Sequence, residues 1–222
     1  MLEFLLSTPP AAKDGTPVLV LLHGRGSRMG DLQGLRRALP PEAAVLTPQA
    51  PHKGLAWGYG PGWAWYRYGG EDLAERGSIL ESLEALEIFM AQLPEHLGFR
   101  PGPVVLGGFS QGGTTGLAYT LTHPGAVAGV VNLSGFLISE EVLGIGPEAL
   151  GQTPVFWGHG TQDPAVPYPL AESGSRRLRD AGVGLEVRDY PMGHRINHEE
   201  VKDLNLWLET VIAGWPGQAS QS

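Results

Sequence analysis

The chain contains 222 residues, of which 42% are hydrophobic and only 17% are charged. This hydrophobic content excludes intrinsic disorder for most of the chain, and the length suits a single hydrophobic core. The formal net charge is −8 and the 15 basic residues form no long cluster, so nucleic acid is not an expected partner.

The chain has no cysteine, which excludes disulfides, a thiolate nucleophile and a cysteine-based zinc site. The longest uninterrupted apolar run, residues 18–22, is far shorter than the roughly 20 residues that a membrane span requires. The first residues also lack the basic region of a secretory signal peptide. We therefore expect a cytoplasmic protein without a membrane-spanning segment.

Short apolar runs alternate along the chain with longer amphipathic segments. The runs predict strands at residues 2–6, 17–22, 43–46, 104–106, 127–133, 155–157 and 185–190, and the segments predict helices at residues 31–39, 72–93, 111–122, 168–181 and 197–211. This alternation predicts an α/β fold with a mostly parallel, doubly wound sheet and helices on both faces. We expect one domain over residues 1–215 and a disordered tail over residues 216–222.

The connection at residues 47–71 is longer than usual and contains a third of the chain's aromatic residues. Connections of this length are commonly functional, and the aromatic content argues against disorder. We expect Trp63, Trp65 and Tyr66 to contact the substrate as part of a wall or lid over an acyl pocket. A packed patch between the subunits of a homodimer is the alternative interpretation.

A candidate nucleophile lies where a predicted strand meets a predicted helix. The residues Gly108-Phe109-Ser110-Gln111-Gly112 match G-x-S-x-G, a pattern that alone arises often by chance in so glycine-rich a chain. Its position between strand and helix is typical of a nucleophile elbow, the tight turn that exposes a catalytic serine. The sequence therefore predicts Ser110 as the nucleophile.

A serine nucleophile needs a base and an acid, which follow it in that fold in the chain order serine, acid, histidine. His194 follows the last predicted strand in a glycine-containing loop, whereas His198 falls at the start of the last predicted helix. Asp163 follows the carboxyl end of a predicted strand, whereas Asp180 and Asp189 fall at a helix end and inside a strand. We predict Asp163 as the acid and His194 as the base.

Two backbone amides are needed to bind the negative oxygen of the tetrahedral intermediate. One is that of Gln111, the residue after the nucleophile. The other is expected in the glycine-rich loop that follows the strand at residues 17–22, where Arg25 is the predicted donor. An ordinary turn or a weak phosphate loop is the alternative for that segment, although no G-x-x-x-x-G-K-[ST] motif is present.

Four separated segments together resemble the phospholipase/carboxylesterase family of α/β-hydrolases. They are LLHGRGS (21–27), GGFSQGG (107–113), HGTQDPAVP (159–167) and PMGHRI (191–196). The resemblance implies hydrolysis of carboxylic esters or thioesters by Ser110, Asp163 and His194 through an acyl-enzyme, with no metal or cofactor. It also implies an oxyanion hole formed by the Arg25 and Gln111 amides.

Two positions depart from the family pattern. Arg25 stands where the family often has a leucine that faces the acyl chain, and Arg67 stands where many members have an aspartate. Both changes disfavour long apolar substrates, so we expect a small-molecule ester with a short to medium acyl group.

The sequence leaves two other functions open. A non-catalytic binding protein could use the same fold, because fold does not determine function. A metal hydrolase could use His194 and His198, although the chain lacks the H-E-x-x-H arrangement.

Overall fold

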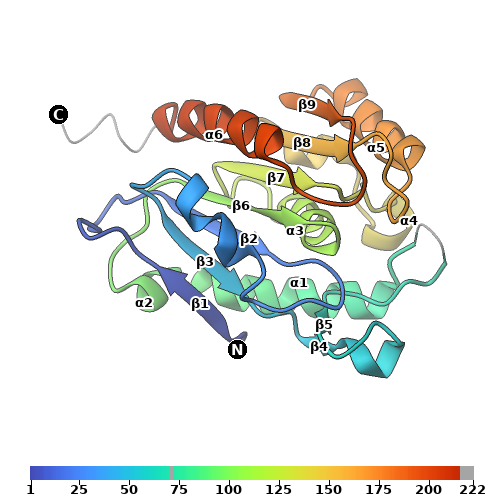
Figure 1. Ribbon diagram of the computed structural model, residues 1–222, viewed down its shortest axis with the longest axis horizontal. Coiled ribbons are helices and arrows are strands. Elements are labelled where there is room, and N and C mark those ends of the chain that lie inside the picture. The colour runs from blue at the N-terminus through green and yellow to red at the C-terminus, as the bar shows by residue number, and fades with distance from the viewer. Residues whose placement is uncertain (71–72, 216–222) are drawn as a thin grey trace.

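The computed structural model describes residues 1–70 and 73–215, so the predicted tail at residues 216–222 lies outside the described residues. Seven strands form one sheet in the order β1-β3-β2-β6-β7-β8-β9 (Figure 1). Their bounds are β1 (Phe4–Ser7), β2 (Val18–Leu22), β3 (Ala44–Pro48), β6 (Val104–Phe109), β7 (Gly129–Leu133), β8 (Val155–Gly160) and β9 (Leu185–Tyr190). Only β1 at one edge runs antiparallel to its neighbour, and the other pairs are parallel.

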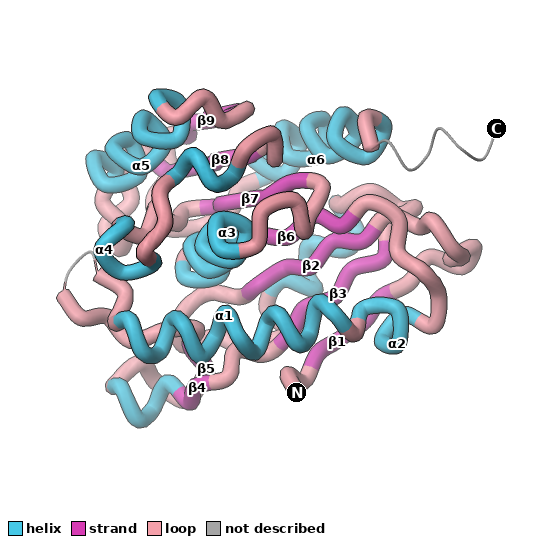
Figure 2. Tube along the Cα trace, turned by 180° about the vertical axis from the view of Figure 1, so that it is seen from behind, coloured by secondary structure: helices cyan, strands magenta, loops and turns pink. Residues whose placement is uncertain are grey.

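Helices cover both faces of this sheet. The longer ones are α1 (Arg76–Ala91), α3 (Gln111–Thr122), α5 (Tyr168–Asp180) and α6 (His198–Ala213). Figure 1 shows α6 in front of the sheet, and Figure 2, seen from behind, shows α1, α3 and α5 in front of the opposite face. The mostly parallel, doubly wound α/β fold predicted from the alternation of apolar runs is therefore confirmed.

The hydrophobic core has two parts, one on each side of the sheet. Strand β2 is buried along its whole length, because its alternate side chains enter opposite parts of the core. Val18, Val20 and Leu22 pack on the side of α1 and α3, whereas Leu19 and Leu21 pack on the side of α6. A continuous apolar run is the sequence pattern that such a two-sided strand requires.

Two predicted helices differ from the structure. The segment predicted at residues 72–93 is α1 followed by the short helix α2 (Leu93–Leu97), in which Pro94 occupies the first turn. Proline cannot donate to the carbonyl four residues earlier, so a helix that reaches it ends and restarts. The segment predicted at residues 31–39 is the 3₁₀ helix η1 (Leu32–Ala38).

The connection at residues 47–71 contains short elements that periodicity did not reveal. Strands β4 (His52–Lys53) and β5 (Trp63–Ala64) pair antiparallel, with the 3₁₀ helix η2 (Gly54–Trp57) between them. Two further short elements, α4 (Glu140–Leu143) and η3 (Pro147–Leu150), lie between β7 and β8. Within the described residues, no helix is both long and apolar enough to cross a bilayer.

Candidate active site

Ser110 lies on the turn between β6 and α3, with φ of 57° and ψ of −121°. A residue other than glycine rarely adopts a positive φ, so the neighbouring structure must hold this turn in place. A Cβ at Gly108 or at Gly112 would collide with the carbonyl oxygen of Leu22 in β2. The absence of side chains at both glycines therefore lets the turn pack directly against β2, as the nucleophile-elbow prediction requires.

The structure brings Ser110, His194 and Asp163 together in one hydrogen-bonded chain. His194 Nε2 lies 3.0 Å from Ser110 Oγ, and His194 Nδ1 lies 2.7 Å from Asp163 Oδ2. Because a carboxylate only accepts, Nδ1 carries the proton and Nε2 is left to accept the serine proton. All three side chains follow strands of the parallel sheet, so they meet at its carboxyl edge.

The loop after β8 holds the Asp163 carboxylate in a fixed orientation. Asp163 Oδ1 accepts hydrogen bonds from the backbone N–H groups of Ala165 and Val166, at 2.8 and 2.9 Å. The carboxylate is fully buried, and its other oxygen is the one that faces His194. Backbone donors on one oxygen thus direct the second oxygen toward the imidazole.

A second histidine, His159, supports the same loop. Its Nε2 donates a hydrogen bond of 3.0 Å to the carbonyl oxygen of Val166 and lies 3.6 Å from Asp163 Oδ2. Burial lowers the pKa of His159 below its ordinary value, with an opposing effect from the hydrogen bond to Val166. His159 is therefore neutral and holds the loop closed. The sequence analysis did not assign it a role.

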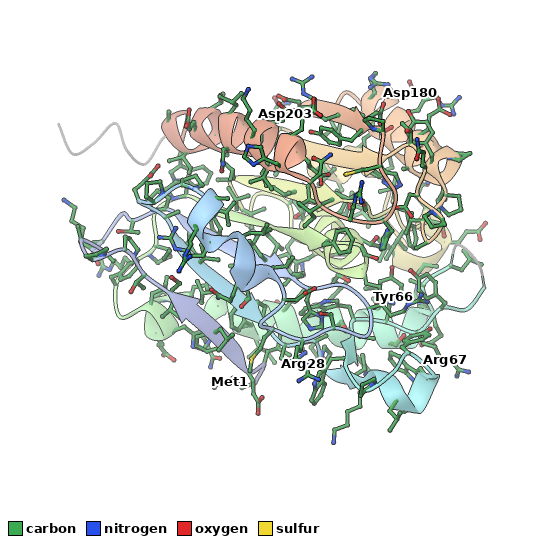
Figure 3. All side chains as sticks on the ribbon, in the orientation of Figure 1. Met1, Arg28, Tyr66, Arg67, Asp180 and Asp203 are labelled. Atoms are coloured by element: carbon green, nitrogen blue, oxygen red, sulfur yellow. The ribbon has the colours of Figure 1, made fainter. Side chains whose placement is uncertain are left out.

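The alternative acid and base residues lie away from Ser110. Asp180 ends helix α5 and is exposed, and Figure 3 places it at the periphery of the molecule. Asp189 accepts a hydrogen bond of 2.9 Å from the Tyr168 hydroxyl. His198 is exposed at the first residue of α6. None of the three forms a hydrogen bond or an ion pair with Ser110 or His194, which bond to each other and to Asp163.

His23 fixes the glycine-rich loop that follows β2. Its Nδ1 donates to the Gly24 carbonyl at 2.8 Å, and its Nε2 accepts from the Gln49 amide and the Ala50 N–H at 2.8 and 3.1 Å. Burial lowers the pKa of His23, which fits the neutral tautomer that this set of partners needs. The loop that carries Arg25 is thereby attached to the end of β3.

Trp63, Trp65 and Tyr66 do not line the pocket beside Ser110, contrary to the expectation from sequence. Trp65 and Tyr66 are both 0% exposed, and Figure 3 shows Tyr66 in the interior while its neighbour Arg67 lies at the periphery. Their size and apolar character place them in the core, which accounts for the difference.

These aromatic residues instead hold the Arg25 loop. The Trp65 indole N–H donates to the His23 carbonyl at 2.9 Å. Trp63 forms a backbone bridge to the same loop, in which its N–H donates to Ser27 and its carbonyl accepts from Gly26, both at 2.8 Å. The long connection therefore shapes the candidate oxyanion hole from outside.

The Gln111 side chain joins that connection to the nucleophile elbow. Its carbonyl oxygen accepts from the Trp65 N–H at 3.1 Å, and its amide donates to the Tyr66 carbonyl at 2.9 Å. Neither the Arg25 amide nor the Gln111 amide donates to a protein acceptor within residues 1–70 and 73–215. Two unused N–H groups thus flank the turn that carries Ser110.

A pocket of about 190 Å³ opens beside the serine. Ser110, His194, Arg25, Tyr68 and Phe109 contribute to its walls, and the Phe109 ring packs on the His194 ring at a centroid distance of 4.7 Å. Tyr68 and Phe109 are contact residues that the sequence analysis did not assign. Phe109 lies inside the G-x-S-x-G motif, directly before Ser110, so the sequence could have indicated that it lies beside the nucleophile.

A larger cavity of about 650 Å³ lies at the opposite end of the sheet, where residues such as Pro17 and Pro103 precede β2 and β6. Its walls contain neither serine nor histidine. Among the described residues, no three His, Cys, Asp or Glu side chains are grouped to hold a metal ion.

A parallel α/β sheet with a serine on a strand-to-helix turn defines the α/β-hydrolase class. The family model described as Phospholipase/Carboxylesterase matches residues 7–212. The chain therefore belongs to this family, and it is a hydrolase that acts on ester bonds.

Curated relatives span nearly the whole chain. The chain is 29% identical to "Acyl-protein thioesterase 1" of Aspergillus fumigatus over 219 residues. This match covers 91% of this chain and 91% of the relative. It is 30% identical over 234 residues to the protein of the same name from Cryptococcus neoformans, covering 93% of this chain and 96% of the relative.

Solved structures have the same fold. A crystal structure of esterase PE8 superposes with a TM-score of 0.80 at 26% identity and covers 95% of this chain and 99% of that one. The Bacillus cereus carboxylesterase superposes with a TM-score of 0.79 at 21% identity over 95% of both chains, a likeness of fold.

Proposed function

We propose that the protein is a serine carboxylesterase that cleaves short to medium acyl esters, and thioesters of similar size, through an acyl-enzyme. The observation that carries this proposal is the hydrogen-bonded chain from Ser110 through His194 to Asp163. Membership of the family supports the reaction class, and the curated relatives named for thioester hydrolysis support the inclusion of thioesters. The cation that Arg25 contributes to the pocket wall supports the limit on acyl length, because a long apolar chain beside it would be disfavoured.

In the first half of the reaction, Ser110 Oγ bonds to the ester carbonyl carbon while His194 Nε2 takes the hydroxyl proton. The carbonyl electron pair moves onto oxygen, where the amides of Arg25 and Gln111 stabilise the negative charge. When the carbonyl re-forms, the bond to the alcohol oxygen breaks and the imidazolium returns its proton to that oxygen. Asp163 stabilises the imidazolium throughout.

In the second half, water attacks the acyl-enzyme by the same route. His194 takes a proton from the water as its oxygen bonds to the carbonyl carbon, and then gives this proton to Ser110 Oγ as the acyl bond breaks. The products are a carboxylic acid and the free serine. No step uses a metal or cofactor.

The test combines covalent labelling with turnover. A fluorophosphonate should label Ser110 in the wild-type protein and leave Ser110→Ala unlabelled, as shown by mass spectrometry of the labelled peptide. Loss of Ser110 or His194 should lower turnover of p-nitrophenyl butyrate roughly 10⁴- to 10⁶-fold, because these groups act as a unit.

His198→Ala is the matched control, since this exposed histidine lies four residues after His194, and its turnover should equal that of the wild type. EDTA should also leave turnover unchanged. Undiminished hydrolysis by Ser110→Ala, or loss of turnover in His198→Ala alone, would overturn the proposal.

A further inference from the structure

Arg25 places a cation in the pocket beside the candidate nucleophile. Its guanidinium carbon lies 4.9 Å from the centroid of the Tyr59 ring and 5.2 Å from that of the Tyr68 ring. A guanidinium at these distances from two aromatic faces is attracted by both rings. The side chain is thus oriented by contacts, even though the residue as a whole is exposed.

The two tyrosines come from different parts of the connection at residues 47–71. Tyr68 lies near its end, and its N–H donates to the Tyr59 hydroxyl at 2.8 Å. Gly26, next to Arg25, has φ of +74°, and a Cβ there would approach the Tyr59 carbonyl oxygen to 2.5 Å. Close packing of this kind fixes where the arginine stands relative to the rings.

The charges on the pocket wall come from Arg25 and Asp31, together with His194 when it is protonated. Arg25 forms no ion pair with a carboxylate of the described residues, and neither does Asp31 with a cation. The Arg25 amide is also a proposed oxyanion donor, so its side chain starts at the scissile carbonyl. An anionic group a few bonds from that carbonyl would therefore be within reach of the guanidinium.

The cation in the pocket limits what else such a substrate contains. The pocket beside Ser110 measures about 190 Å³, and a second pocket of about 330 Å³ shares Asp31, Phe109 and His194 with it. A long acyl chain that lies against Arg25 would leave the guanidinium partly desolvated without a partner, which costs free energy. A short acyl group that ends in a carboxylate supplies that partner.

Resting on the serine esterase function proposed above, we propose that Arg25 selects esters whose short acyl group carries a second carboxylate, that is, half-esters of dicarboxylic acids. The guanidinium, held between Tyr59 and Tyr68, binds the free carboxylate while the ester carbonyl occupies the oxyanion hole. Arg25 thus contributes its backbone to catalysis and its side chain to specificity.

The test measures kcat/KM for three methyl esters of similar length, followed by proton release at constant pH. Monomethyl glutarate is the anionic ester, methyl pentanoate is the neutral one and methyl 4-(trimethylammonio)butanoate is the cationic one. The wild type should prefer the anionic ester over the neutral one by about tenfold. High salt should reduce that preference, because the arginine is exposed.

Three variants assign the preference to the side chain. Arg25→Leu keeps the backbone amide, so it should still hydrolyse methyl pentanoate but lose the preference, mainly through a higher KM for the anionic ester. Arg25→Lys should retain part of the preference, because an ammonium lacks the planar fork of a guanidinium.

Arg28→Leu is the matched control. It removes a positive charge from the same loop at an exposed residue, which Figure 3 shows at the edge of the molecule, and should keep the full preference.

The inference would be overturned if the ratio of kcat/KM for the anionic ester to that for the neutral ester were the same in Arg25→Leu as in the wild type. It would also be overturned if the wild type preferred the cationic ester, which would point to Asp31 instead. Hydrolysis of methyl pentanoate by Arg25→Leu shows that this variant is folded. Should Arg25→Leu fail to fold, Arg25→Gln removes the charge and keeps a polar side chain, and a wild-type preference for the anionic ester in that variant would overturn the inference. Failure of the esterase function itself gives a different result, namely no fluorophosphonate label on Ser110 and no turnover of any of the three esters.

Discussion

Gln111 serves the site with its backbone and its side chain in separate ways. Its backbone N–H is a proposed oxyanion donor, and its buried side chain joins the elbow to Trp65 and Tyr66. Trp65 in turn holds the His23 carbonyl in the loop that carries the other proposed donor. This side chain therefore helps to fix the distance between the two proposed oxyanion amides, together with the contacts of His23 and Trp63.

Gln111→Ala should lower both turnover and stability while it leaves the backbone amide in place. Two buried backbone groups would lose their partners, at a cost of about 1–3 kcal/mol each, which corresponds to a Tm lower by roughly 5–15 °C. Looser positioning of the amides should reduce kcat about 10- to 100-fold.

The measurements are thermal unfolding and steady-state turnover. Gln33→Ala is the control, because Gln33 also donates a side-chain hydrogen bond, to Thr47 at 3.0 Å, but lies outside the site. An unchanged kcat in Gln111→Ala would show that the side chain does not position the oxyanion amides.

The G-x-S-x-G motif, the chain order serine, acid, histidine and the positions after predicted strands were enough to predict Ser110, Asp163 and His194. The structure brings these three residues together. The supporting contacts were not predictable in the same way. His23 accepts a hydrogen bond from the distant Ala50 N–H, and His159 donates one to the Val166 carbonyl across a loop. No spacing rule encodes such partners. Substrate contact was assigned to buried Trp65 for a similar reason, since composition alone does not separate a pocket wall from a core.

The junction of β6 and α3 depends on close contact with β2. Gly112 lies in the first turn of α3, where alanine would normally stabilise a helix by about 1 kcal/mol. Here a Cβ would collide with the Leu22 carbonyl oxygen, a backbone atom that cannot rotate away. The steric cost should exceed the gain in helix propensity.

Gly112→Ala should therefore lower the Tm by more than about 5 °C and reduce turnover, because α3 and Ser110 must shift away from β2. Gly34→Ala is the matched control. Gly34 lies in the 3₁₀ helix η1, and a Cβ there would have no neighbour within 4 Å, so its Tm should stay the same or rise slightly. Equal Tm values for the two variants would contradict the importance of this close contact.

Predictions of the strands and helices succeeded for several elements of about six residues or more, in which a pattern has room to repeat. Helix α3 and strand β9 have the predicted bounds. Strands β4 and β5 were missed because each has only two residues, too few for any periodicity to show. Strand β5 is held by backbone hydrogen bonds to the Arg25 loop, and β4 is held by its pairing with β5.

The stability of the folded chain should depend on pH through buried titratable groups on both sides of neutrality. His23 and His159 have lowered pKa values because of burial, so the unfolded chain binds more protons than the folded one as pH falls below about 6.5. Their contribution to stability is present above that pH and is lost in acid. A buried carboxyl at Glu200 acts in the opposite direction.

Glu200 lies in the first turn of α6, is 0% exposed and packs against Gly158 of β8. Its carboxyl oxygens have no hydrogen-bond partner among the described residues, and burial raises its pKa from 4.5 to about 8. Between these two values the folded state holds a proton that the unfolded state releases. The stability that Glu200 contributes is therefore fully present below about pH 4.5, declines as pH rises and is lost through about pH 8.

Glu200→Gln removes this titration and keeps nearly the same shape. The free energy of unfolding, measured by urea denaturation from pH 5 to pH 9, should fall with rising pH in the wild type more steeply than in the variant. Glu200→Gln should accordingly be the more stable protein at pH 9, because a buried carboxylate without partners is costly. Glu199→Gln changes the neighbouring exposed carboxylate, so it should follow the wild-type curve. A constant difference between Glu200→Gln and the wild type across this range would show that Glu200 does not titrate in the folded protein.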